Sequence, residues 1–334
     1  MTLVVGATGT LGTEICRRLA SAGKPFRAMV RSSSDPAKKE RLKQLGGELV
    51  EADLKDRDSL DRACVGATAV ITTATATLSQ QEGDTFETVD LRGQMQLIDA
   101  ASMAKVGHFV FVSLSGNALQ HGDNPLFEAK QVVENHLRRS GLTYTILRPT
   151  FFMEFWFSPI VGFDFANAKA PIYGSGENEI SYISLRDVAD FAVGALFSPW
   201  ARNAVLELGG PEALSQLEAV QIFEEISGRI FEKRFVSEEA IQAEKDAAAN
   251  PVERTFADIN LCAVRGDKID MGEKFTEFSV EPNSVRDYAT TVMGAPAATA
   301  TASTAATAST AATATATTAA TATSTPTPTS GSGG

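Results

Sequence analysis

Residues that commonly bind metals or form disulfide bonds are scarce in this chain. Its 334 residues include only three cysteines and three histidines. All six are scattered, without the paired spacing of a zinc site or of a disulfide framework; they are Cys16, Cys64, Cys262, His108, His121 and His136. We therefore expect no metal site and no disulfide-based fold.

Basic residues are outnumbered by acidic ones, and long apolar runs are absent from the sequence. Lys and Arg number 30 against 41 Asp and Glu, which gives a formal net charge of −11. General nucleic-acid binding needs clustered Lys and Arg, so the composition argues against it. No stretch is apolar for long enough to span a membrane, and no basic segment followed by an apolar one opens the chain. We expect a cytoplasmic protein.

A glycine-rich turn near the start is the strongest positive signal. Gly6, Gly9 and Gly12 follow an apolar run over residues 3–5 that is typical of a buried parallel strand. The apolar residues behind the turn recur at helical spacing. Such glycines allow a tight turn, a close approach of the backbone to a pyrophosphate, and close packing of helix on sheet. This order predicts a dinucleotide-binding motif.

Arg31 stands at the end of the second predicted strand, over residues 25–30, and three serines follow it. In a Rossmann sheet this position faces the adenosine ribose, where an acidic residue suits a 2′-hydroxyl and an arginine suits a 2′-phosphate. Arg31 therefore favours NADP(H) over NAD(H). The alternative is a solvated surface arginine.

Further candidate residues follow the next predicted strands. Asp53 and Leu54 close the strand over residues 48–52, and Thr73 ends the strand over 67–73. Ser113 follows the almost wholly apolar strand over 108–112. Ligands of open α/β sheets bind at the carboxyl ends of the strands, so we expect these residues at one edge.

The alternation of strands and helices predicts an α/β fold, with a Rossmann-type doubly wound parallel sheet and a small mixed C-terminal lobe. We assign the Rossmann core to residues 1–150, and the remaining sheet elements and substrate lobe to 151–293. An aromatic patch at 151–157 is a candidate substrate wall, dimer face or part of the core. Residues 294–334 are rich in Ala and Thr and carry no charge, which predicts a disordered tail.

Taken together, several segments resemble the atypical short-chain dehydrogenase/reductases, and within them the NmrA-like, isoflavone-reductase-like group. The resemblance covers about residues 1–293. It is carried by residues 4–12, 29–31, Asp53, 110–113, Lys130 with Glu134, 143–149 and 182–189.

This resemblance implies an NAD(P)-binding Rossmann domain with a variable small lobe over the nicotinamide. Arg31 would contact the 2′-phosphate, Asp53 and Leu54 the adenine, and Lys130 the nicotinamide ribose. The residues implied at the pyrophosphate are Gly6, Thr8, Gly9, Thr10 and Leu11.

The chain departs from the family's catalytic pattern at one position. Classical members carry Tyr-x-x-x-Lys, in which the tyrosine is the acid and the lysine lowers its pKa. Here Leu126 stands four residues before Lys130, and no tyrosine precedes residue 142. The usual proton donor is therefore missing.

Two functions fit this pattern. The first is an NADPH-dependent reductase of a small quinone-like or conjugated carbonyl substrate, in which Lys130, Ser113 or a water supplies or stabilises the proton. Such substrates need less acid assistance than a simple ketone. The second is a non-catalytic NADP(H)-sensing regulator or assembly factor that acts on a protein partner. The sequence leaves both monomer and oligomer open.

Overall fold

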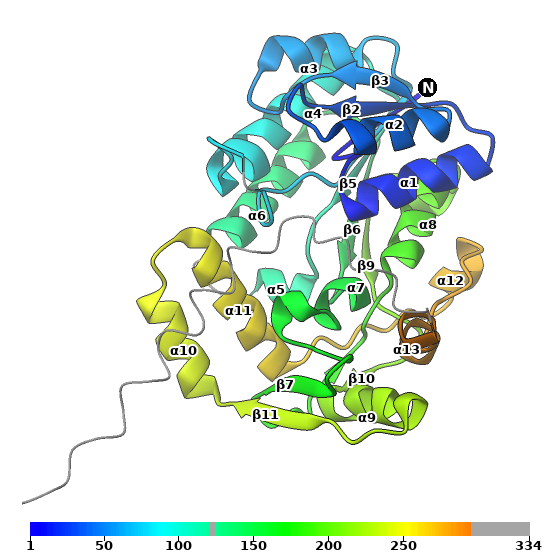
Figure 1. The fold of residues 1–334 in the computed structure, drawn as a ribbon. Coiled ribbons are helices and arrows are strands. Elements are labelled where there is room, and N and C mark those ends of the chain that lie inside the picture. The colour runs from blue at the N-terminus through cyan, green and yellow to red at the C-terminus, as the bar shows by residue number, and fades with distance from the viewer. Residues whose placement is uncertain (80, 121–123, 295–334) are drawn as a thin grey trace, which may run out of the picture. The chain divides into compact units, whose positions relative to one another are not determined.

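Seven parallel strands form the central sheet of this protein, whose computed structural model describes residues 1–79, 81–120 and 124–294 (Figure 1). Every neighbouring pair of strands is parallel. In spatial order the strands are β3 (Glu48–Glu51), β2 (Phe26–Val30), β1 (Thr2–Val5), β4 (Ala69–Thr72), β5 (His108–Val112), β6 (Tyr144–Pro149) and β9 (Ala204–Leu208). The chain reverses its direction of winding after β3, which confirms the predicted doubly wound Rossmann-type fold.

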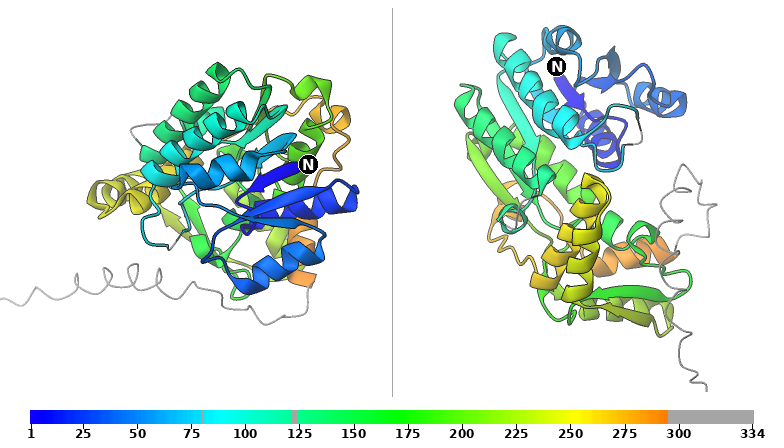
Figure 2. Two further views of the ribbon diagram at one scale, coloured as in Figure 1. Left: turned by 90° about the horizontal axis from the view of Figure 1, so that it is seen from above. Right: turned by 90° about the vertical axis from the view of Figure 1, so that its left-hand side faces the viewer.

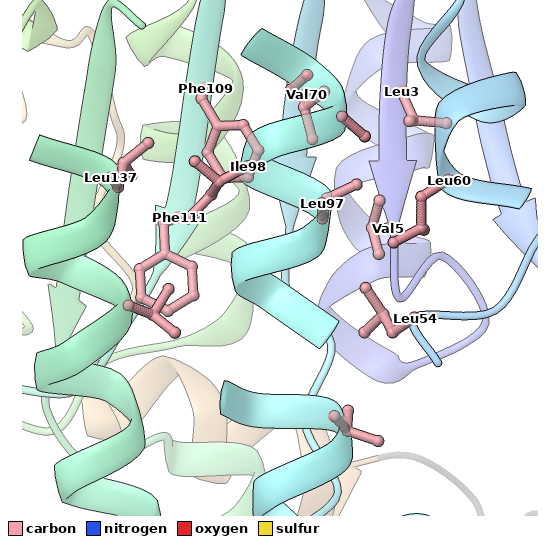
Figure 3. Packing of buried hydrophobic residues seen from close by; sticks show 14 of the residues in the cluster. Leu3, Val5, Leu54, Leu60, Val70, Leu97, Ile98, Phe109, Phe111 and Leu137 are labelled. Carbon is pink, nitrogen blue, oxygen red and sulfur yellow. The ribbon is translucent and has the colours of Figure 1, made fainter. Parts of the chain in front are cut away.

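Helices cover both faces of the sheet (Figure 2). The helices on one face are α3 (Arg57–Cys64), α4 (Gln94–Met103) and α6 (Pro125–Arg139). Figure 3 shows their apolar side chains, such as Ile98 and Leu137, beside Phe109 and Phe111 of β5. The opposite face is covered by α1 (Thr10–Ser21), α2 (Pro36–Gln44) and α8 (Leu185–Ala195). Because strands β1, β4 and β5 are buried on both faces, their sequences are nearly continuous apolar runs.

One continuous helical segment runs from Phe86 to Met103, and its first two turns are not α-helical. Residues Phe86–Gly93 form a π-helix, η1, which continues directly into α4. Thr85 caps η1, and its side chain and that of Thr88 form a reciprocal capping box. Wide π-turns are rare and are frequently found at functional sites.

The segment after β5 contains a short helix, α5 (Gly116–Leu119), and residues 121–123 lie outside the described part. The smaller lobe lies beyond the carboxyl ends of the strands (Figure 1). Its strands are β7 (Lys169–Tyr173) with β11 (Glu232–Val236), a parallel pair, and β8 (Glu179–Ile180) with β10 (Leu214–Ser215), an antiparallel pair. Its helical segments are α7 (Met153–Trp156), η2 (Pro159–Val161), α9 (Gln216–Ser227), α10 (Glu238–Ala247), α11 (Pro251–Arg265), α12 (Lys274–Glu277) and α13 (Val285–Gly294), and η3 (Pro199–Ala201) links α8 to β9.

The aromatic patch of residues 151–157 belongs largely to the core of this lobe. Trp156 and Phe157 are buried, and Phe157 packs against Phe163, Tyr182 and Phe223 at centroid distances of 4.9–5.3 Å. The other three phenylalanines of the patch are partly buried. Within the described residues, no helix is long and apolar enough to cross a membrane. The tail predicted to be disordered lies outside the described residues, apart from Gly294.

Candidate functional site

The glycine turn after β1 has the close packing that the sequence predicts. Gly6 adopts a positive φ of 82°, and a Cβ added there would lie 2.7 Å from the Thr73 hydroxyl. A Cβ at Gly12 would overlap the carbonyl oxygen of Gly6. Two glycines are thus required to bring the turn, the first helix and the end of β4 together. Thr73, also a predicted site residue, lies directly beside this turn.

Helix α1 starts from this turn with its first N–H groups uncapped by any side chain. Gly9 is the N-cap residue and has no side chain that could cap the helix; its carbonyl accepts the first helical hydrogen bond, from the Thr13 N–H at 2.9 Å. Thr8 is partly exposed, Gly9 and Thr10 are exposed, and the Leu11 side chain is buried beneath them. Unpaired N–H groups and the positive end of the helix dipole attract anions. The five residues predicted to bind the pyrophosphate thus lie together at the uncapped start of α1.

A buried glutamine fixes the neighbouring strand end. Gln94 accepts a hydrogen bond from the Thr72 hydroxyl at 3.0 Å and donates one to the Ala74 carbonyl at 3.0 Å. Its side chain is fully buried at the start of α4. These bonds hold the segment that faces Gly6, and no motif in the sequence indicated them.

Arg31 lies at the end of β2 and forms an ion pair rather than standing free. Its Nη1 is 2.6 Å from Oδ2 of Asp84, and Lys55 contacts the other oxygen of the same carboxylate. Asp53 lies beside them, with its carboxylate 3.8 Å from Lys55 Nζ. The Leu54 side chain is buried in the core, so only its backbone can face a ligand. The structure thus groups Arg31 and Asp53, and adds Lys55 and Asp84.

Lys130 and Ser113 lie together at the carboxyl end of β5. Lys130 Nζ is 3.4 Å from Oδ1 of Asp90 and 3.5 Å from the carbonyl oxygen of Val112, the residue before Ser113. The lysine side chain is 6% exposed and that of Asp90 is fully buried. The other oxygen of Asp90 accepts a hydrogen bond from the Ala76 N–H at 2.8 Å. A buried ion pair on η1 and α6 therefore positions the lysine.

The Ser113 hydroxyl is buried and has no hydrogen-bond partner among the described residues. Buried hydroxyls are nearly always paired, so an unpaired one at a strand end is a candidate ligand contact. Lys130 has three N–H donors, of which two are directed at Asp90 and Val112. One ammonium donor and one hydroxyl are thus available to a ligand at this point.

No tyrosine replaces the missing proton donor. Leu126 lies one turn before Lys130 on α6 and is buried in the core. Tyr173 and Tyr182 are buried in the lobe, and burial raises the pKa of both phenols, that of Tyr173 to about 12. Burial likewise raises the pKa of Tyr288, and Tyr144 begins β6 at the opposite end of the sheet.

Arg148, within the segment 143–149 that carries part of the family resemblance, has a structural role. Its guanidinium contacts both oxygens of Glu134 at 2.9 and 2.6 Å, and Glu207 at 3.0 Å. Glu207 also accepts the Gly116 N–H at 2.9 Å. The hydrogen bonds that Arg148 donates to Glu134 and Glu207 raise its pKa. This network ties α6, β6 and β9 together beside the site.

The predicted residues follow the sheet in spatial order. Asp53, Arg31, Gly6, Thr73 and Ser113 come after β3, β2, β1, β4 and β5, which are adjacent strands. At roughly 4.8 Å between strands, this edge spans about 19 Å. Four residues of this edge were not predicted from the sequence: Lys55, Asp84, Asp90 and Gln94. The side chain of each contacts a residue at least 20 positions away in the chain, as in the pairs Lys55–Asp84 and Thr72–Gln94. Across the described residues, no three His, Cys, Asp or Glu side chains are grouped as metal ligands.

One family profile and several known proteins are similar to this chain. The NmrA-like family profile matches residues 1–289. Photosystem II assembly factor Ycf39 of Trieres chinensis is 33% identical over 232 residues, which are 68% of this chain and 69% of that protein. NAD(P)H azoreductase of Xenophilus azovorans is 33% identical over 232 residues, 69% of this chain and 74% of that protein.

Among solved structures, the NADPH complex of the NADPH-dependent quinone oxidoreductase QOR2 from Escherichia coli has the same fold. Its TM-score is 0.71 at 21% identity, and the match covers 88% of this chain and 100% of that one. Because the family profile spans both the Rossmann core and the lobe, this protein belongs to the NmrA-like family.

Proposed function

We propose that this protein binds NADP(H) along the carboxyl edge of its sheet and is an NADPH-dependent reductase. The observation that carries the proposal is the row of five predicted site residues on five adjacent strands. The uncapped start of α1 suits the pyrophosphate, and Arg31 suits a 2′-phosphate. Lys130 and Ser113 stand at the β5 end of the row, where the nicotinamide would lie.

The bound nucleotide would supply a hydride, and this chain's residues would bind and orient the reactants. Lys130 would donate its remaining N–H to the nicotinamide ribose and place a positive charge beside a developing oxyanion. The Asp90 carboxylate holds that ammonium in place. Ser113 would donate its hydroxyl proton in a hydrogen bond to a substrate carbonyl. The lobe from residue 151 onward would form the other wall of the substrate site.

The substrate class follows from the missing acid. Without a tyrosine beside Lys130, the described residues give the site no strong proton donor for a simple ketone. A quinone-like or conjugated carbonyl acceptor takes up hydride with less acid assistance. An azoreductase and a quinone oxidoreductase among the similar proteins support this class.

A second candidate function is that of a non-catalytic NADP(H)-sensing regulator or assembly factor. It is favoured by the buried Leu126 at the position of the usual acid. Ycf39, which is named an assembly factor, and the azoreductase are each 33% identical to this chain, so their similarity supports both candidate functions equally. A protein partner then takes the place of the small substrate. The cytoplasmic location remains a prediction.

The two functions are separated by an assay of NADPH oxidation with a panel of quinones, enones and azo dyes. The reductase predicts consumption that is lost in Lys130→Met but kept in Arg139→Met, which removes an exposed cation from the same helix. Tight binding of NADPH without consumption by any acceptor would refute the reductase and favour the sensor. Equal affinity for NADH and NADPH, unchanged by Arg31→Ala, would refute the NADP(H) preference.

A further inference from the structure

The carboxylate of Asp84 is enclosed by donors at the end of strands β2 and β3. It accepts hydrogen bonds from Arg31 at 2.6 Å, from Lys55 and from the Ser79 hydroxyl. Its side chain is only 2% exposed. Burial pushes the pKa of Asp84 upward, but these hydrogen bonds outweigh burial and hold the pKa below its usual value. Asp84 is therefore a firmly bound anion inside this chain.

The donors around Asp84 are of the kind that binds phosphate. Arginine, lysine and a hydroxyl together offer charge-assisted hydrogen bonds to phosphate oxygens. Asp84 neutralises only one of the two cations, and Asp53 lies farther away, 3.8 Å from Lys55. A 2′-phosphate carries close to two negative charges and would match the charges of Arg31 and Lys55.

The two cations remain reachable while the carboxylate does not. The side chains of Arg31 and Lys55 are 30% and 29% exposed, against 2% for Asp84. A phosphate can therefore approach the cations from solvent. It cannot share them with Asp84 at close range, because like charges a few ångströms apart repel strongly.

We propose that Lys55 is the second cation of the 2′-phosphate site and that Asp84 occupies this site until the phosphate of NADP(H) displaces it. Asp84 is thus a built-in competitor that sets the affinity for the phosphorylated nucleotide. The inference rests on the proposed NADP(H) binding at Arg31. It adds that the Asp84 side chain must be displaced before the phosphate binds.

The test is a titration of the full chain with NADPH, NADH and 2′,5′-ADP. Asp84→Asn is expected to tighten NADPH and 2′,5′-ADP about tenfold, since one charge-assisted competitor is lost, and to change NADH less than about twofold. Lys55→Gln is expected to weaken the two phosphorylated ligands about tenfold and to spare NADH. Glu82→Gln, an exposed carboxylate two residues from Asp84, and Lys38→Gln, an exposed lysine, are the matched controls.

Unchanged or weaker NADPH binding in Asp84→Asn would overturn the inference, as would unaltered binding in Lys55→Gln. Circular dichroism confirms the fold of each variant, and Asp84→Ser replaces Asp84→Asn if the latter does not fold. Failure of the wild-type chain to bind NADPH would refute the proposed function and the inference together. NADPH binding that Asp84 variants do not tighten would refute the inference alone.

Discussion

The buried pair of Lys130 and Asp90 yields the most exacting prediction. Lys130→Met leaves Asp90 without a counter-charge in a fully buried position. At 3.4 Å, with an effective dielectric constant of about 20, the lost attraction is roughly 5 kcal/mol. Removing one partner of a buried ion pair generally costs about 3–5 kcal/mol, because the remaining charge is left uncompensated. We expect Lys130→Met to lower the free energy of unfolding by about 4 kcal/mol.

A double variant isolates the cause. Lys130→Met with Asp90→Asn removes both charges and should lie within about 1 kcal/mol of wild type. The asparagine can still accept the Ala76 N–H, which Asp90 accepts at 2.8 Å.

Urea unfolding followed by intrinsic fluorescence at pH 7 measures these differences, with Arg139→Met as the control for loss of a cation from α6. The reasoning is refuted if Lys130→Met is as stable as wild type at pH 7. It is also refuted if the double variant is no more stable than Lys130→Met.

Three further predictions use the same unfolding assay. Burial lowers the pKa of His108 to about 4. The free energy of unfolding of the wild type should therefore rise by up to about 3 kcal/mol as the pH rises from 4 to 6.5, and His108→Gln should remove this rise. Burial raises the pKa of Asp187 to about 6, which has the opposite effect. The contribution of Asp187 to the free energy of unfolding should fall by up to about 3 kcal/mol as the pH rises from 4 to 6. If Asp187→Asn leaves the dependence of stability on pH unchanged, this prediction is contradicted. Gly12→Ala places a methyl group against the Gly6 carbonyl, so it should lower the free energy of unfolding by more than about 2 kcal/mol and abolish NADPH binding. Gly9→Ala should lower the free energy of unfolding by less than about 1 kcal/mol, because its Cβ would lie 3.2 Å from the same carbonyl oxygen. Equal losses in the two glycine variants would contradict the packing argument.

The Rossmann half of the fold is predictable from the sequence, because buried parallel strands are short apolar runs between helices. The strand at His108–Val112 matches its predicted bounds. Strands β7 and β11 in the lobe were not predicted. β7 contains Pro171 and β11 is largely charged and exposed, so neither shows the apolar pattern of a strand. Their pairing depends on tertiary contacts.

The candidate site was predictable only where one short motif carries it. The glycine turn and Arg31 each stand at the end of an apolar run, and Lys130 was identified by resemblance. Asp90 lies 40 residues from Lys130, and Asp84 lies 53 residues from Arg31. Such pairs depend on which strands become neighbours and where η1 begins. Nothing local in the sequence encodes them.

The stretch from Asp84 to Gln94 contacts both ends of the proposed nucleotide site. Asp84 reaches Arg31, Asp90 reaches Lys130, and a Cβ at Gly93 would lie 2.8 Å from that of Leu54. The two ends are therefore not energetically independent. Substitutions at Asp84 and Asp90 should show an interaction energy in a double-mutant cycle, although one bears on nucleotide affinity and the other on the lysine. Effects of substitutions along this segment on nucleotide affinity and on stability are therefore not expected to add residue by residue.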